Sequence, residues 1–173
     1  MHRQSDWKRK AGRLSFFLSN TQQDTGTQDS LPVLLYSDES VADLSRDGLR
    51  LIQPNRGFRF GEDTVLLADF AASLFDRRPG KSIRVADLGA GSGASSILLM
   101  ARLAAAHVLA VELEPHSFSA LERNRRLNHL DGRMDVIASD YSRWSQTLPD
   151  GPDGNSLRAA FDLVIVNPPY GLP

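Results

Sequence analysis

The sequence predicts an α/β fold with a parallel sheet and helices on both faces of that sheet. Between residues 83 and 166, strand-length apolar segments alternate with helix-length segments, and this alternation is typical of βαβ units. The first and fourth apolar segments, residues 83–88 and 161–166, are nearly continuous in their apolar character. That character indicates strands that are covered on both faces.

The predicted elements follow one another in a regular order. Strands are predicted over residues 83–88, 108–111, 134–138 and 161–166. Helices are predicted over residues 95–105, with Ile97, Met100, Ala101 and Ala104 as the buried face, over 115–128, and as a short stretch over 142–148. Pro115 suits the first turn of its helix, because no N–H is needed there. A loop rich in Pro, Gly and Asp is predicted over residues 150–154.

A loop and a further helix are predicted before this alternation. Residues 57–61 place an aromatic-Arg-aromatic triplet between two glycines, which predicts a shaped loop. Residues 62–64 are typical of a helix start, and the buried face of that helix is predicted at Leu67, Phe70, Ala71 and Leu74. Residues 77–80, two arginines followed by Pro and Gly, end it. Residues 1–35 are polar and predict a mobile leader, so the domain extends over residues 36–173.

Composition limits the possible functions. The 173 residues are 41% hydrophobic and 24% charged, which suits one domain with one core. With a net charge of -1, any contact with nucleic acid would depend on a local patch such as Arg123, Arg125 and Arg126, although such a cluster is more often a solvated helix face. The chain has no cysteine and hence no thiolate metal site, which fits a cytoplasmic protein that needs no metal. No apolar run approaches the roughly 18 residues that span a membrane.

A glycine-rich loop follows the first predicted strand. Residues 87–93 read Asp-Leu-Gly-Ala-Gly-Ser-Gly, with glycines at Gly89, Gly91 and Gly93. Glycines at a strand-to-helix junction let the backbone turn tightly and approach a ligand that a β-carbon would exclude. The sequence therefore predicts that this loop binds a cofactor.

Four polar side chains stand at the ends of the successive strands. Asp87, Glu112, Asp140 and Asn167 are separated by 25, 28 and 27 residues, and each interval is the length of one βα unit. We therefore expect them to converge at one edge of the sheet. Glu112 is placed to accept hydrogen bonds from both hydroxyls of a ribose, and Asp140 from an exocyclic adenine amine. Alternatively, Glu112 is a solvated strand-end residue and Asp140 caps the helix that follows.

Two cofactors are compatible with the glycine loop. Gly89, Gly91 and Ala94 satisfy the dinucleotide-binding fingerprint, with Glu112 close to the expected ribose acid. S-adenosylmethionine fits better, because Asp87 can balance its ammonium and sulfonium charges. Asp140 also supplies an acid that dinucleotide enzymes do not need. The sequence therefore predicts S-adenosylmethionine as the cofactor.

The tetrapeptide Asn167-Pro168-Pro169-Tyr170 follows the last predicted strand. The side-chain carbonyl of Asn167 and the backbone carbonyl of Pro168 can accept both N–H groups of an amine that is conjugated with a ring. The two prolines hold these carbonyls rigidly, and Tyr170 offers a face on which a base can stack, worth roughly 1–3 kcal/mol. The tetrapeptide is similar to the catalytic motif of the amino-methyltransferases, which implies methyl transfer to a planar nitrogen.

From about Asp47 to Tyr170 the chain resembles the tRNA methyltransferases that modify N6 of an adenine in the anticodon loop of a valine tRNA. The distinguishing stretch, residues 53–70, contains the Gly-aromatic-Arg-Phe-Gly-x-Asp pattern of that family. The resemblance implies a class I methyltransferase fold with a Rossmann-like sheet, a tRNA substrate and a role in tRNA processing by RNA methylation. It also implies that four further residues close the cofactor pocket near the methionine end: Arg59, Phe60, Gly61 and Asp63.

Other methyltransferases share the tetrapeptide and remain alternatives. They act on the glutamine N5 of release factors, on adenine N6 in DNA or on guanine N2 in rRNA. A non-catalytic module that binds cofactor or RNA is a further alternative. The leader is too short and polar for the helical N-terminal domain of the glutamine enzymes, and is either dispensable or a basic arm that contacts tRNA.

The family fold implies seven strands in the order 3-2-1-4-5-7-6, whereas this sequence stops just after the fourth. We therefore expect a truncated chain that keeps the cofactor-binding half and has weak or no catalytic activity. Residues 161–166 would then form an unpaired apolar edge strand, which favours aggregation.

Overall fold

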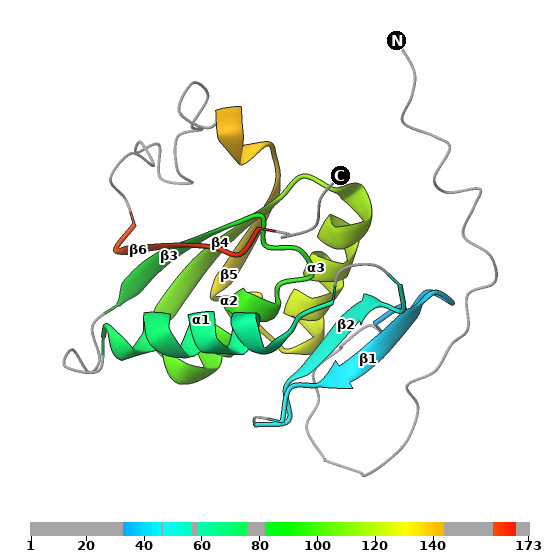
Figure 1. Ribbon diagram of the computed structural model, residues 1–173, viewed down its shortest axis with the longest axis horizontal. Coiled ribbons are helices and arrows are strands. Elements are labelled where there is room, and N and C mark those ends of the chain that lie inside the picture. The colour runs from blue at the N-terminus through cyan, green and yellow to red at the C-terminus, as the bar shows by residue number, and fades with distance from the viewer. Residues whose placement is uncertain (1–32, 46, 57–58, 76–81, 144–160, 169–173) are drawn as a thin grey trace.

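The computed structural model describes residues 33–45, 47–56, 59–75, 82–143 and 161–168. Its centre is a four-stranded parallel sheet that consists of β3 (Ile83–Leu88), β4 (Ala106–Glu112), β5 (Met134–Ala138) and β6 (Leu163–Val166). The strand order is β5-β4-β3-β6, and these strands lie side by side in Figure 1. The predicted α/β fold with a parallel sheet is confirmed.

The strand order contains a switch point beside β3. The chain proceeds from β3 to β4 and β5 on one side and then returns to the other side of β3 with β6. Leu88, at the end of β3, therefore lies opposite both Val111 of β4 and Val166 of β6. Ligands of open α/β sheets bind beyond the carboxyl ends of the strands at such a point, so this edge is the first place to look for a site.

Three helices accompany the sheet: α1 (Glu62–Ser73), α2 (Ala94–Arg102) and α3 (Pro115–Leu127). α2 connects β3 to β4, and α3 connects β4 to β5. Both crossovers advance in the same direction across the sheet, so right-handed connections place both helices on the same face. α1 packs against α2, and residues 94–100 of α2 are all buried. Ile97 and Met100 are buried as predicted, whereas Ala104 lies beyond the end of the helix and is exposed.

The predicted buried face of α1 is wrong at two positions. Phe70 is 66% exposed and Leu74 is 54% exposed. The residues that are buried are small, namely Thr64, Ala68, Ala71 and Ala72. Because α1 packs directly against α2, its alanines allow the two backbones to approach closely, and the larger apolar side chains lie on the outer side.

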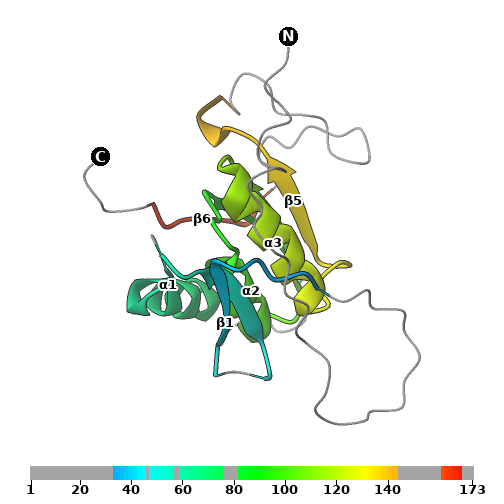
Figure 2. The ribbon, with the colours of Figure 1, turned by 90° about the vertical axis from the view of Figure 1, so that its right-hand side faces the viewer.

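A β-hairpin that the sequence analysis does not predict precedes α1. β1 (Glu39–Asp43) pairs antiparallel with β2 (Arg50–Pro54), and Leu51 and Ile52 of β2 are buried. The hairpin packs on α3, and Figure 2 shows α3 between the hairpin and β5. On the edge of β2 that faces away from β1, the side chains of Asn124 and Asn128 in α3 form the hydrogen bonds that a neighbouring strand would form.

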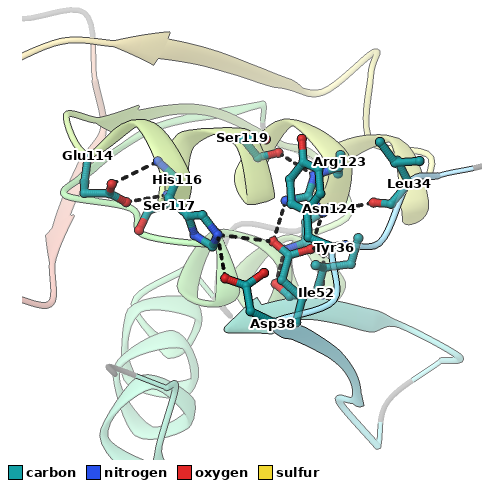
Figure 3. A network of polar contacts seen from close by, with 11 residues as sticks. Leu34, Tyr36, Asp38, Ile52, Glu114, His116, Ser117, Ser119, Arg123 and Asn124 are labelled. Carbon is teal, nitrogen blue, oxygen red and sulfur yellow. Dashed lines mark hydrogen bonds and ion pairs between the residues drawn. The ribbon is translucent and has the colours of Figure 1, made fainter. Parts of the chain in front are cut away.

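Arg123 is not part of a basic surface, contrary to the possibility raised from the sequence. Its guanidinium is buried and forms a two-pronged ion pair with the buried carboxylate of Glu39, with Nη2 2.6 Å from Oε1. The guanidinium carbon also lies 4.4 Å from the ring centre of Tyr36, and Nη1 donates to the carbonyl of Leu34 at 2.9 Å. These contacts, which Figure 3 shows, join residues 34–39 to α3. Arg126 is exposed.

The remaining predicted elements have the following outcomes. β3 and β5 have the predicted bounds, and β4, β6, α2 and α3 differ from prediction by one to three residues at an end. A short 3-10 turn, η2 (Tyr141–Arg143), stands at the start of the helix predicted over 142–148. Within the described residues β5 and β6 are the edge strands of the sheet, and Val164 and Val166 of β6 are exposed. Three predicted features lie wholly or mainly outside the described residues: the leader, the loop over 150–154 and the helix end over 77–80.

Candidate functional site

The four polar residues that the sequence predicts to converge lie at or just after the carboxyl ends of parallel strands in one sheet. Asp87 lies in β3 and Glu112 ends β4, while Asp140 and Asn167 follow β5 and β6. Because the four strands are parallel, their carboxyl ends meet at the same edge. Asp87 pairs in register with Ile165 of β6, so the glycine loop begins beside the strand that leads to Asn167.

The three glycines of the loop serve different purposes. Gly89, Gly91 and Gly93 all have positive φ, at 72°, 58° and 92°, a region that side chains disfavour. A β-carbon on Gly93 would lie 2.6 Å from Cδ1 of Leu121, so α3 packs directly against the loop. A β-carbon on Gly91 would meet no atom within 4 Å. The loop is therefore packed at Gly93 and borders open space at Gly91, which is the condition for a close ligand.

Glu112 fixes the glycine loop from the next strand. Its Oε2 accepts a hydrogen bond from the N–H of Gly91 at 2.7 Å, and its Oε1 accepts from the N–H groups of Leu113 and Glu114, each at 2.8 Å. An oxygen of a carboxylate has two acceptor sites, so Oε2 can accept one more donor without breaking these bonds. The side chain is buried and is not the solvated strand-end residue of the alternative interpretation.

Asp87 is buried beneath the loop, with 1% exposure. Its Oδ2 accepts a hydrogen bond from Oγ of Ser96 in α2 at 2.6 Å. Burial raises the pKa of Asp87 to about 6; the hydrogen bonds from Ser96 oppose this rise, and the charge of Glu112 adds to it. The carboxylate thus ties the end of β3 to the first turn of α2, which holds the loop between them.

Asp140 occupies the position of a cap. Its Oδ1 accepts from the N–H of Ser142 at 2.9 Å and from the hydroxyl of Ser142 at 2.6 Å, and these bonds begin η2. This geometry is the capping arrangement that the sequence leaves open.

Two apolar residues that the sequence analysis does not single out stand beside these acids. Leu113 follows Glu112 and is 62% exposed, and Tyr141 follows Asp140 and is 41% exposed. Cε1 of Tyr141 lies 3.6 Å from where a β-carbon of Gly89 would be, so its ring adjoins the loop. Exposed apolar groups next to hydrogen-bond acceptors suit a heteroaromatic ring with an amine. The sequence offers one signal for Leu113 and Tyr141, namely that each directly follows an acidic residue at the end of a strand.

Asn167 is bonded to the start of α1. Its Nδ2 donates to Oδ2 of Asp63 at 2.8 Å and to Oγ1 of Thr64 at 3.1 Å. These bonds turn the amide nitrogen toward α1 and, because the amide is planar, also fix the direction of the side-chain carbonyl. Asp63 is exposed and Thr64 is buried. Pro168 is described next to Asn167, whereas Pro169 and Tyr170 lie outside the described residues.

The other residues implied by the family resemblance surround the same helix start. Gly61 caps α1 in an extended conformation, and its carbonyl accepts from the N–H of Thr64 at 3.2 Å. Phe60 packs against the hydrophobic core. Nη2 of Arg59 lies 2.8 Å from the carbonyl oxygen of buried Gln53 once that amide is correctly oriented. Asp63, grouped with these from sequence, contacts Asn167, and this contact links two motifs about one hundred residues apart.

Two kinds of feature are not found in the described part of the chain. No group of three or more His, Asp or Glu side chains there could hold a metal ion. No helix in the described ranges is long and apolar enough to cross a membrane.

Comparisons with known proteins agree with this architecture. Residues 77–150 match the profile of the TRM5/TYW2 methyltransferase domain. The tRNA1(Val) (adenine(37)-N6)-methyltransferase of Glaesserella parasuis is 33% identical over 108 residues, which are 62% of this chain and 39% of that protein. The enzyme of the same name from Shewanella woodyi is 32% identical over 114 residues, 66% of this chain and 42% of that protein. The chain thus spans about two fifths of the length of these relatives.

Solved structures show the same fold. The SAM-dependent methyltransferase from Agrobacterium tumefaciens aligns with 83% of this chain and 45% of its own length, at 15% identity and a TM-score of 0.54. At that identity the likeness shows the fold alone. The chain therefore has the fold of the class I S-adenosylmethionine-dependent methyltransferases, and residues 77–150 are similar in sequence to one of their domain families.

Proposed function

We propose that this chain carries the methyl-transfer site of an enzyme that methylates the exocyclic N6 of an adenine in tRNA. The observation that supports the proposal most directly is the orientation of Asn167, whose amide nitrogen is held by Asp63 and Thr64. An amide held in this way presents its carbonyl in a fixed direction at the carboxyl end of β6. A fixed acceptor beside the glycine loop is what a planar amine needs for alignment.

We assign the cofactor to the space bordered by Gly91. S-adenosylmethionine, when bound, supplies an activated methyl group. Gly91 lets the backbone approach it, and Oε2 of Glu112 retains an acceptor site for one ribose hydroxyl. Leu113 and Tyr141 offer apolar surface to the adenine, with Asp140 as acceptor for its amine. In this assignment Asp87 supports the loop through Ser96, and its carboxylate would balance the positive charges of the cofactor.

We assign the target amine to Asn167 and Pro168. An amine conjugated with a ring is a weak nucleophile, because its lone pair is delocalised into that ring. Acceptance of its two N–H groups by the Asn167 and Pro168 carbonyls would align the nitrogen and favour the more nucleophilic geometry. Pro169 and Tyr170 complete this site by sequence, with Tyr170 as the stacking face. Alignment of this kind can lower the barrier by about 7–11 kcal/mol.

The tRNA substrate is inferred from the relatives. Two proteins that are named for adenine(37) N6 of tRNA1(Val) match 62–66% of this chain at 32–33% identity. The matched part of those enzymes is about two fifths of their length, so the substrate is part of the proposal. With a tRNA substrate, we expect the protein to act in the cytoplasm, where tRNA is decoded.

The test has two stages. Calorimetric titration of this chain with S-adenosylhomocysteine is expected to show binding, and the Glu112→Ala variant is expected to lose it. Incubation with labelled cofactor and unmodified tRNA is then expected to yield N6-methyladenosine after nuclease digestion, and no product with the Asn167→Ala variant. Binding accompanied by methylation of a release-factor glutamine or of rRNA guanine instead of tRNA adenine would overturn the substrate assignment.

A further inference from the structure

Asn124 of α3 has a buried polar side chain that lies between the β1–β2 hairpin and the glycine loop. It has no exposed surface. Its Oδ1 accepts from the N–H of Ile52 at 2.6 Å, and its Nδ2 donates to the carbonyls of Ile52 and Ser92, each at 2.8 Å. Ile52 belongs to β2 of the hairpin, and Ser92 belongs to the glycine loop. Figure 3 shows Asn124 and Ile52 beside the buried ion pair of Arg123.

Asn128, one helical turn later, provides a natural comparison. Its Oδ1 accepts from the N–H of Arg50 at 2.9 Å, and its Nδ2 donates to the carbonyl of Arg50 at 2.8 Å. The two amides therefore bond alternate residues of β2 as a neighbouring strand would. The third bond of Asn128 goes to the carbonyl of Asn124, within the helix. Only Asn124 of the two reaches the glycine loop.

Ser92 lies between Gly91 and Gly93 in the glycine loop, next to the proposed cofactor space. The residue before it, Gly91, borders open space and is held by Glu112. The residue after it, Gly93, packs against Leu121 of α3. The bond from Asn124 to the Ser92 carbonyl is a further anchor, and it sets the orientation of the peptide plane between Ser92 and Gly93, one residue from Gly91. Loss of this anchor would leave a part-buried carbonyl without its donor, which is costly.

We infer that Asn124 is a positioning residue for the cofactor loop and that it couples cofactor binding to the docking of the β1–β2 hairpin. The inference rests on the proposed cofactor site. Asn124 does not touch the cofactor in this assignment; it acts through Ser92. Since coupling between two sites is reciprocal, a cofactor that orders the loop also tightens the hold of Asn124 on Ile52.

The first test compares three variants by calorimetric titration with S-adenosylhomocysteine, at a temperature where thermal unfolding shows each to be folded. Asn124→Ala is expected to bind about 5- to 10-fold more weakly, the effect of one lost buried hydrogen bond. Asn128→Ala removes a matching set of bonds to the hairpin and none to the loop, so it changes affinity only through the coupling and is expected to weaken binding by no more than about twofold. Glu39→Gln loosens the hairpin through its ion pair, and it is likewise expected to weaken binding by less than Asn124→Ala does.

The second test needs no variant and applies even where Asn124→Ala does not fold. Amide hydrogen exchange of the unaltered chain is followed with and without saturating S-adenosylhomocysteine. Ligand is expected to slow exchange of the Ile52 amide, which Asn124 holds, more than exchange of the Arg50 amide, which Asn128 holds. Equal protection of the two amides would overturn the coupling.

The outcomes separate this inference from the proposed function. If the unaltered chain does not bind S-adenosylhomocysteine, the cofactor site itself is wrong. If it binds and Asn124→Ala binds as tightly, or Glu39→Gln weakens binding by as much as Asn124→Ala, the positioning role of Asn124 is wrong while the cofactor site stands.

Discussion

Asp87 illustrates how one carboxylate can be structural within a binding motif. Its side chain is buried against Ser96, and its pKa is raised to about 6 from 3.8. The native state therefore binds a proton in the range between these values that the unfolded state does not. The charged form is held at a cost, which the hydrogen bonds from Ser96 only partly offset.

This imbalance predicts a pH dependence of stability. Because the native pKa exceeds the unfolded one, the contribution of Asp87 becomes more favourable as the pH falls from about 7 to about 4, by up to about 3 kcal/mol. The Asp87→Asn variant lacks this titration. Urea unfolding of both proteins without ligand is expected to show a free-energy difference that shifts in favour of the native sequence over that range. A difference that stays constant with pH would contradict the raised pKa.

Asp63 and Thr64 are predicted to act on catalysis through Asn167. Thr64→Val removes one of the two acceptors that orient the amide, so the rate of methylation is expected to fall about 5- to 10-fold. Affinity for S-adenosylhomocysteine is expected to remain unchanged, because the bond that is removed goes to Asn167. Single-turnover kinetics and calorimetry measure the two quantities. Asp69→Asn is the matched control, since Asp69 lies on α1 but pairs with Arg102; its rate is expected to equal that of the unaltered chain.

At the scale of elements, the sequence predicts best where local periodicity and spacing agree. The strands β3 and β5 and the helix α3 follow from apolar stretches and from Pro115. The hairpin is missed because the outer edge of β2 is completed by Asn124 and Asn128, which are more than seventy residues away. The outward position of Phe70 is likewise decided by the close approach of α1 to α2.

In the candidate site, too, some features follow from the local sequence and others depend on packing. Convergence of the strand-end acids follows from the regular spacing of the βα units. The contact of Asn167 with α1 does not follow from spacing, since it joins residues 63–64 to residue 167 across the sheet. Its geometry depends on how α1 packs, and no local pattern encodes that.

The glycine loop yields a prediction that separates packing from binding. Gly93→Ala combines a disfavoured φ with a β-carbon 2.6 Å from Leu121, so the free energy of unfolding is expected to fall by about 2–4 kcal/mol. Gly91→Ala meets no neighbour and is expected to lose only about 1 kcal/mol from backbone strain. Its methyl group projects into the proposed cofactor space, so its affinity for S-adenosylhomocysteine is expected to fall sharply. Denaturant unfolding and calorimetry of both variants check this contrast.

At the scale of the whole molecule, a buried ion pair connects the start of β1 to α3 of the α/β domain. Glu39 and Arg123 are both buried, and the guanidinium also packs on Tyr36 and bonds the carbonyl of Leu34. His116 adds a longer contact to Asp38, with Nε2 and Oδ2 3.7 Å apart. Residues 34–39 are therefore integrated with α3 by polar contacts rather than by a large apolar surface.

Removal of one member of this pair is predicted to be more harmful than removal of both. Arg123→Met leaves Glu39 as a buried unpaired charge, so the free energy of unfolding is expected to fall by about 3–5 kcal/mol. The double variant Glu39→Leu/Arg123→Met replaces the pair by apolar side chains, and its stability is expected to recover much of that loss. Denaturant unfolding of the single and double variants gives the coupling free energy. Additive losses would mean that the two side chains contribute independently, whereas recovery would show that the loss in the single variant comes from leaving a buried charge without its partner.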